Sequence, residues 1–211
     1  MTYAFINKYF MSLLFRFLLV LSPAFIFAQG HVKEIDCVNN IKLYKSYEDY
    51  SKGKVLDSAC LSKQGNELEK YWGRIVLKKE KEKKKYSHGS LWGYQIGETL
   101  YRYSDDGKTF KIVYGYSELV DSDGLFIYIF REGYNYGIRG TYKIHYQYSK
   151  DLESPIKELT ISNLAKDIQN ADFIADVKAT VEDLSKNKSS SIKQTAISEF
   201  NTKYRTHFPK K

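Results

Sequence analysis

From residue 71 onward, six segments rich in β-branched and aromatic residues follow one another along the chain. They are 71–78, 91–96, 99–104, 109–116, 124–132 and 141–149. The Asp-Gly pairs within 104–108 and 121–125 are typical of tight hairpin turns, which need positive φ angles. Such short connections leave no room for the crossover that parallel neighbours require. The sequence therefore predicts a meandering antiparallel β-sheet of about six to eight strands.

The segment 124–132 is apolar on both faces, because Ile127 and Ile129 alternate with Phe126 and Tyr128. A strand of this kind is central and covered on both sides, so the sheet needs a second layer. Helical spacing of apolar residues over 171–185 and 190–205 supplies that layer.

A shorter helix is expected after residue 160, with Thr160 or Ser162 as its N-cap, and Ser191 is the expected N-cap of the last helix. The fold class is therefore α+β: the antiparallel sheet is followed by two or three C-terminal helices. We expect a single domain over 29–211, mainly β over 35–150 and mainly helical over 155–208.

For the segment 35–62, which precedes the meander, the sequence predicts only short elements. The letters IKLY (41–44) indicate a short strand, and SYEDYSKG (46–53) indicates one helical turn or a tight loop. Ser46 is its expected cap and Gly53 its expected stop. Residues 63–70 are polar and are interpreted as a loop.

The first 28 residues have the layout of a secretory signal peptide. Arg16 lies at the start of an apolar stretch, Pro23 interrupts that stretch, and Ala28 is the small residue before the expected cleavage. A start at Met11 would leave the signal complete. An uncleaved anchor is the alternative, but its apolar stretch is near the lower length limit for spanning a membrane. We expect cleavage, and no membrane span in the mature chain.

Two cysteines, Cys37 and Cys60, remain after cleavage. An isolated pair in an oxidising compartment suggests a disulfide, and two buried thiols are the alternative. The histidines are scattered and no Cys-x-x-Cys occurs, so neither a metal site nor a cofactor is predicted. The histidines are His31, His88, His145 and His207.

The chain carries a formal net charge of +8, and its densest basic run is KKEKEKKK at 78–85. Such a run can contact phosphate or an anionic surface. Glu80 and Glu82 dilute it, and no aromatic residue within it can stack on a base. We therefore interpret it as a solvated edge or hairpin arm, and expect no nucleic-acid partner.

Aromatic residues are concentrated at 89–110, where two interpretations stay open. Trp92 and Tyr94 are expected on one strand face, with Arg102 on the next strand able to grip an anion, so these residues form a candidate ligand platform. The alternative is that the tyrosines fill the core and the sheet edge.

Catalytic motifs do not occur in the sequence, and no catalytic residue is assigned. His145, expected on the polar surface of its strand, is the best single candidate for acid–base chemistry or ligand contact. The segment DSDG (121–124) is interpreted as a hairpin turn, because the later ligands of a calcium loop do not follow it.

Four segments and the helical tail that follows them together resemble a family of small exported proteins of Bacteroidota. The segments are FAQ (27–29), LYKSYEDYSKGK (43–54), GSLWGYQIGETLYRY (89–103) and YQYSKDLESPIKELTISNLAKDI (146–168). The resemblance implies export and assigns no activity or ligand.

Together these features predict a periplasmic or secreted protein of a Gram-negative bacterium. Its expected role is a non-enzymatic binding or envelope-associated domain that uses a Tyr/Trp-rich sheet. The candidate partners are a glycan, a lipid, a peptide or an envelope protein. A hydrolase whose acid and base groups converge only in three dimensions is one alternative. A structural or protein-interaction module is the other.

Overall fold

A computed structural model of the chain describes residues 37, 39–71, 74–87, 89–104, 115–134, 141–186 and 191–209. The predicted signal peptide (1–28), the expected turn at 105–107 and most of the expected strand 109–116 lie outside these residues. Statements about the structure refer to the described residues.

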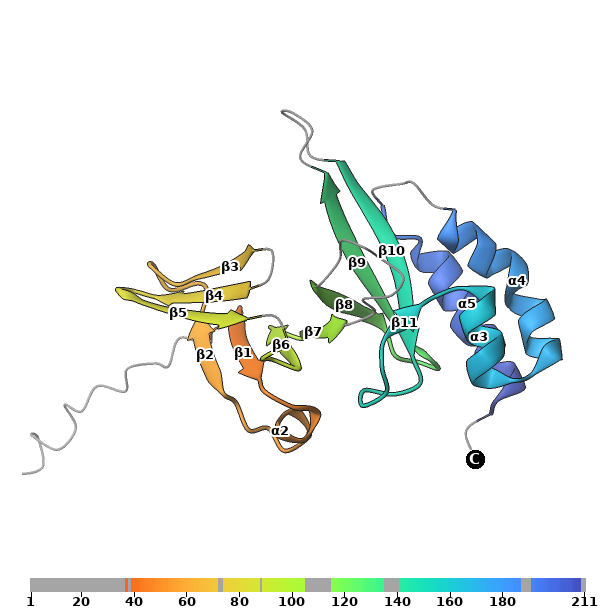
Figure 1. The fold of residues 1–211 in the computed structure, drawn as a ribbon, viewed down its shortest axis with the longest axis horizontal. Coiled ribbons are helices and arrows are strands. Elements are labelled where there is room, and N and C mark those ends of the chain that lie inside the picture. The colour runs from red at the N-terminus through yellow and green to blue at the C-terminus, as the bar shows by residue number, and fades with distance from the viewer. Residues whose placement is uncertain are drawn as a thin grey trace, which may run out of the picture. The chain divides into compact units, whose positions relative to one another are not determined.

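The described strands form two antiparallel sheets, the large sheet of eight strands and the small sheet of three (Figure 1). In the large sheet the neighbours run in the order β11-β10-β9-β8-β7-β6-β1-β2, and the small sheet runs β3-β4-β5. The strands of the large sheet are β1 (Asn40–Tyr44), β2 (Asp57–Cys60), β6 (Gly93–Ile96), β7 (Thr99–Ser104), β8 (Gly115–Asp121), β9 (Phe126–Tyr134), β10 (Thr141–Ser149) and β11 (Lys157–Glu158). Those of the small sheet are β3 (Glu67–Tyr71), β4 (Arg74–Lys79) and β5 (Glu82–Ser87). The predicted meander is confirmed from β6 to β11, and the β1–β2 hairpin extends it by pairing β1 with β6.

The loop predicted for 63–70 is wrong in its second half, because β3 begins at Glu67. Leu68 packs against the core between the two sheets, whereas Glu67 and Glu69 form ion pairs with Lys78. One partly buried leucine between charged neighbours is a weak strand signal, and pairing with β4 supplies the rest of the stabilisation. The lysine run forms the hairpin arm that was expected, over the end of β4 and most of β5.

Two hydrophobic clusters stabilise the large sheet. The first joins it to the small sheet through the buried residues Ile41, Leu43, Ala59, Ile75, Leu77, Leu91 and Tyr94. The second joins β9 and β10 to the C-terminal helices, and Phe173, Val177, Val181, Leu184 and Phe200 are among its buried helical residues. The sheet and helices thus form the expected α+β arrangement (Figure 1).

The helices of the described region are α2 (Tyr47–Ser51), α3 (Ile161–Ile168), α4 (Ala171–Ser185) and α5 (Gln194–His207). Thr160 caps α3, because its side chain accepts a hydrogen bond from the backbone N–H of Asn163 at 3.2 Å. The cap predicted at Ser191 is wrong: α5 begins after Lys193, which makes no side-chain capping bond. In the described part of the chain, no helix combines the length and apolar character that a bilayer span requires.

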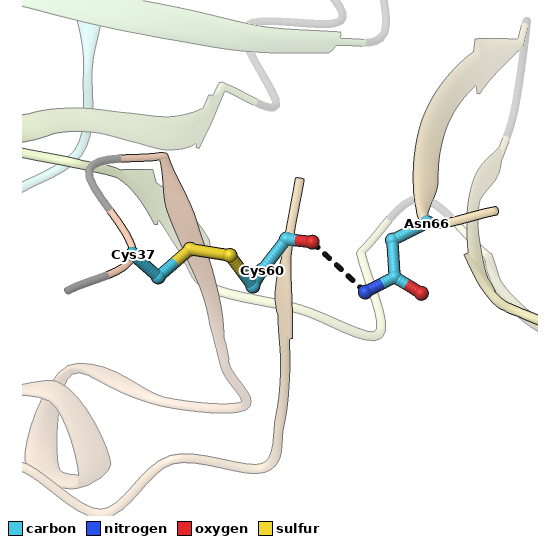
Figure 2. Close-up of a disulfide and its surroundings, with 3 residues drawn as sticks. All are labelled: Cys37, Cys60 and Asn66. Atoms are coloured by element: carbon cyan, nitrogen blue, oxygen red, sulfur yellow. Dashed lines mark hydrogen bonds between the residues drawn. A yellow bond between two sulfur atoms is a disulfide. The ribbon is translucent and has the colours of Figure 1, made fainter. Parts of the chain in front are cut away.

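The predicted disulfide is confirmed (Figure 2). It joins Cys37, just before β1, to Cys60 at the end of β2, with the two Cα atoms 5.7 Å apart. The Asn66 side-chain amide donates a hydrogen bond of 2.8 Å to the backbone oxygen of Cys60. A disulfide of this kind is typical of proteins in oxidising compartments.

A single row of paired residues crosses the large sheet and defines its two faces. Residues directly opposite each other in antiparallel strands share a face. The row is Leu43, Tyr94, Tyr101, Glu118, Ile129 and Tyr146. Leu43 belongs to the core under the small sheet, and Tyr146 belongs to the core under the helices. Both covering layers therefore pack on this face, the first face, and the opposite side is the second face.

Candidate functional site

The middle of the first face carries four mutually packed tyrosines. We call Tyr94, Tyr101, Tyr103 and Tyr116, which come from β6, β7 and β8, the tyrosine cluster. The rings of Tyr94 and Tyr101 stack with centroids 4.7 Å apart and planes at 10°. The ring centroid of Tyr116 lies 5.1 Å from that of Tyr94 and 5.5 Å from that of Tyr103.

Exposure differs within the tyrosine cluster. Tyr94 is fully buried, whereas Tyr101, Tyr103 and Tyr116 each keep part of their surface accessible. Tyr101 and Tyr116 pack against the edge of the core under the small sheet, and the Tyr103 ring packs on Tyr116. The cluster is thus aromatic surface at the edge of that core.

Lys70 of β3 places its ammonium over this surface. The Nζ atom lies 4.5 Å from the ring centroid of Tyr101 and 5.1 Å from that of Tyr94. The residue as a whole is exposed, but its ammonium packs on the rings and loses part of its hydration. This loss lowers the pKa of Lys70 below its usual range, with Glu118 opposing the change and Arg131 reinforcing it. Among the described acids, none forms an ion pair with Lys70.

Two further polar groups lie at the tyrosine cluster. Glu118 is paired in register with Tyr101 and forms an ion pair with Arg131 of β9. The Tyr94 hydroxyl is buried, and no group in the described residues forms a hydrogen bond with it. Burial raises the pKa of this hydroxyl well above its usual range, so it stays a neutral donor.

The second face carries a separate buried network around Arg102. Its guanidinium donates to the Tyr128 hydroxyl at 2.8 Å and to the backbone oxygen of Ser154 at 3.0 Å. It also donates at 3.3 Å to the Ser149 hydroxyl and to the backbone oxygen of Asp151. These acceptors are neutral, and the network fastens the chain after β10 onto β7. Arg102 Nε is buried and has no partner in the described residues.

Other buried polar side chains continue along the second face. The Gln147 side-chain oxygen accepts a hydrogen bond of 2.5 Å from the Ser117 hydroxyl, and its NH₂ group lies 3.4 Å from Ser104 Oγ. His145 Nε2 lies 2.7 Å from Glu132 Oε2. The expectation that His145 lies on a polar surface is wrong, because the residue is only 7% exposed. Its neighbours on β9, Phe130 and Glu132, lie against the ring and help to bury the side that alternation had marked as solvent-facing.

The structure separates the residues that were predicted to form one platform. Tyr94 lies on the first face in the core, whereas Trp92 packs on Arg102, 5.1 Å from its guanidinium, on the second face. The shared face expected for Trp92 and Tyr94 is therefore wrong: Trp92 precedes β6, in a bend, and packs against Tyr50 of α2. His145 lies on β10, the third strand from β7 in the sheet order.

Sequence reasoning missed Lys70 and Glu118 as members of the site. Lys70 was assigned to a loop, and only its strand register with Ile75 brings it to the cluster. The signal that was available is the alternation of Leu68 and Lys70 with Glu67 and Glu69.

In the part of the chain that the structure describes, no three His, Cys, Asp or Glu side chains lie together in a way that could hold a metal ion. No protein-family model, curated protein sequence or solved structure matches this chain. The function is therefore inferred from the geometry of the chain itself.

Proposed function

We propose that this protein is an exported, non-enzymatic binding domain that holds a sugar chain on the tyrosine cluster. The observation that carries the proposal is the set of partly exposed tyrosines, Tyr101, Tyr103 and Tyr116, on a sheet face at the edge of the core under the small sheet. A sheet that used tyrosine only as core filler would bury these rings as it buries Tyr94.

The chemistry of the cluster suits a sugar. The C–H groups of a sugar's apolar face pack on aromatic rings, and its hydroxyls bond to polar groups at the rim. Lys70, Glu118 and Arg131 provide polar groups beside Tyr101. Because the rings are held by a paired sheet, little conformational entropy is lost when a ligand binds.

Export to the periplasm or the medium agrees with two features of the chain. The Cys37–Cys60 disulfide is typical of an oxidising compartment. The layout of residues 1–28 predicts a cleaved signal peptide. The resemblance to small exported proteins of Bacteroidota supports the same assignment.

Two of the described acids, Asp57 and Asp167, do not favour the hydrolase alternative. Burial would raise the pKa of Asp57, but hydrogen bonds from Lys79 and Tyr86 outweigh it and lower the pKa to about 2. Partial burial would also raise the pKa of Asp167, but hydrogen bonds from Lys157 and Tyr148 bring it below the usual range. A general acid needs a pKa near the working pH. These carboxylates therefore act as fixed anions that hold the fold.

The proposal is tested with protein exported from a Gram-negative host and titrated calorimetrically with a panel of oligosaccharides. Tyr101→Ala removes a partly exposed ring, and we expect it to weaken binding by about fivefold or more, because an aromatic contact contributes about 0.5–1.5 kcal/mol beyond its buried area. Tyr47→Ala is the matched control, since Tyr47 is a partly exposed tyrosine of α2 outside the cluster. Equal losses in the two variants, or no binding of any oligosaccharide by the unmodified protein, contradict the proposal.

A further inference from the structure

We propose that the sugar is acidic, and that its carboxylate binds the ammonium of Lys70 while its ring packs on Tyr101. This inference rests on the proposed function and names the class of ligand for the same site. It is carried by an exposed cation that lies over two aromatic rings and has no acidic partner in the described region.

Lys70 differs in this respect from four lysines of the neighbouring hairpin. Lys78 and Lys83 both form ion pairs with Glu69. Lys79 and Lys84 both form ion pairs with Asp57. Each of these four lysines thus has a carboxylate partner, whereas the Lys70 ammonium lies over ring faces and is influenced by the charge of Glu118 without forming an ion pair with it. A cation that has lost part of its hydration gains most from an anion brought by a ligand.

The positions of the polar groups fit one negative charge next to a ring. A sugar on Tyr101 places its substituents within reach of Lys70, because the ammonium lies only 4.5 Å from that ring centroid. Glu118 pairs in register with Tyr101 and would repel a densely charged group, although Arg131 neutralises part of its charge. A single carboxylate fits this arrangement better than a doubly charged phosphate.

The test compares an oligogalacturonate with its methyl ester, because the two share the same rings and differ in charge. For the unmodified protein, we expect the acid to bind about tenfold more tightly than the ester at low salt, and the advantage to shrink as salt rises. Lys70→Met keeps the aliphatic stem and should remove this advantage. Lys70→Arg should retain most of it.

Lys81→Met is the matched control, because Lys81 is an exposed lysine of the same sheet at the β4–β5 turn. It should bind the acid as the unmodified protein does, and circular dichroism should confirm that all variants are folded. Equal binding of acid and ester leaves sugar binding in place and overturns the acidic assignment. Equal loss in Lys70→Met and Lys81→Met also overturns it, because the preference would then reflect net charge. Failure of both of these oligosaccharides to bind, while another oligosaccharide of the panel binds, overturns this inference alone; failure of the whole panel overturns the proposed function as well.

Discussion

The Tyr86 hydroxyl of β5 donates a hydrogen bond of 2.6 Å to the Asp57 carboxylate of β2, joining the small sheet to the edge of the large one. Lys79 of β4 binds the other oxygen of the same carboxylate, and the backbone N–H of Ser58 donates to it at 2.8 Å. Only 8% of the Asp57 side chain is exposed, so these bonds are poorly screened by solvent.

Acid should therefore weaken the fold through Asp57. Its pKa is lowered from 3.8 to about 2 in the folded protein, although burial alone would raise it. Because the folded-state value is the lower one, the stabilisation is complete above about pH 4 and is lost as the pH falls through 2. We expect about 2 kcal/mol of the free energy of unfolding to disappear over this range.

Asp57→Asn should remove this contribution at pH 7 and flatten the dependence between pH 4 and pH 2, as measured by urea unfolding. Glu48→Gln is the control, since Glu48 belongs to an exposed pair with Lys52 and should change stability by less than about 0.5 kcal/mol. The same acid sensitivity in Asp57→Asn and in the unmodified protein would assign the effect to other groups.

Reduction of the disulfide should lower stability by about 3 kcal/mol, because the bond closes a sequence separation of 23 residues in the unfolded chain. The measurement is the denaturant midpoint with and without reductant, with thiol titration to show that reduction is complete. The double variant Cys37→Ala, Cys60→Ala should match the reduced protein and ignore the reductant. An unchanged midpoint after complete reduction would contradict the prediction.

Arg102→Met should release the segment after β10. The substitution removes the donors that hold Tyr128 and the backbone oxygens of Asp151 and Ser154, and we expect a loss of about 2–4 kcal/mol. Hydrogen exchange should rise selectively over 150–156. Arg131→Met, on an exposed arginine that pairs with Glu118, should cost less than about 1 kcal/mol. Unchanged exchange over 150–156 in Arg102→Met would refute the role assigned to Arg102.

Asn201→Ala should loosen the turn between β8 and β9. The Asn201 amide donates to the Asp121 carboxylate at 2.8 Å and to the backbone oxygen of Leu125 at 3.1 Å, and its oxygen accepts from the Leu125 N–H. Loss of these buried bonds should cost about 2–3 kcal/mol in thermal or urea unfolding. Thr202→Ala, on the exposed neighbouring residue, is the control and should be nearly neutral. Equal stabilities of the two variants would show that the turn holds without Asn201.

The turn between β8 and β9 shows which features local sequence signals predict and which they do not. The Asp-Gly pair at 123–124 predicted the hairpin, and β8 and β9 do end and begin on either side of it. The side chain that fastens the turn comes from α5, 76 residues beyond Leu125. No local pattern predicts a contact over that separation.

The sequence likewise predicted one part of the candidate site and missed another. Alternation placed Tyr101 and Tyr103 on the face opposite Leu100 and Arg102, and the structure agrees, since Leu100 and Arg102 are buried while the tyrosines are partly exposed. Alternation did not place Lys70 on these rings, because Lys70 reaches them only when β3 pairs with β4 and the small sheet packs on the large one. It also failed for Trp92, which lies in a bend outside the regular strand.

The sequence by itself determined the elements with a strong period or a strong local hydrogen bond. Helix α4 runs over Ala171–Ser185, as its apolar spacing predicted, and Ser46 caps α2 by accepting from the Asp49 N–H at 3.1 Å. These features depend on neighbours within about one helical turn. Only the tertiary structure decided which faces are covered, that β1 joins β6, and that Lys70 lies over Tyr101. Those outcomes depend on contacts between distant segments, and their energy is gained only after the chain has closed the loops between them.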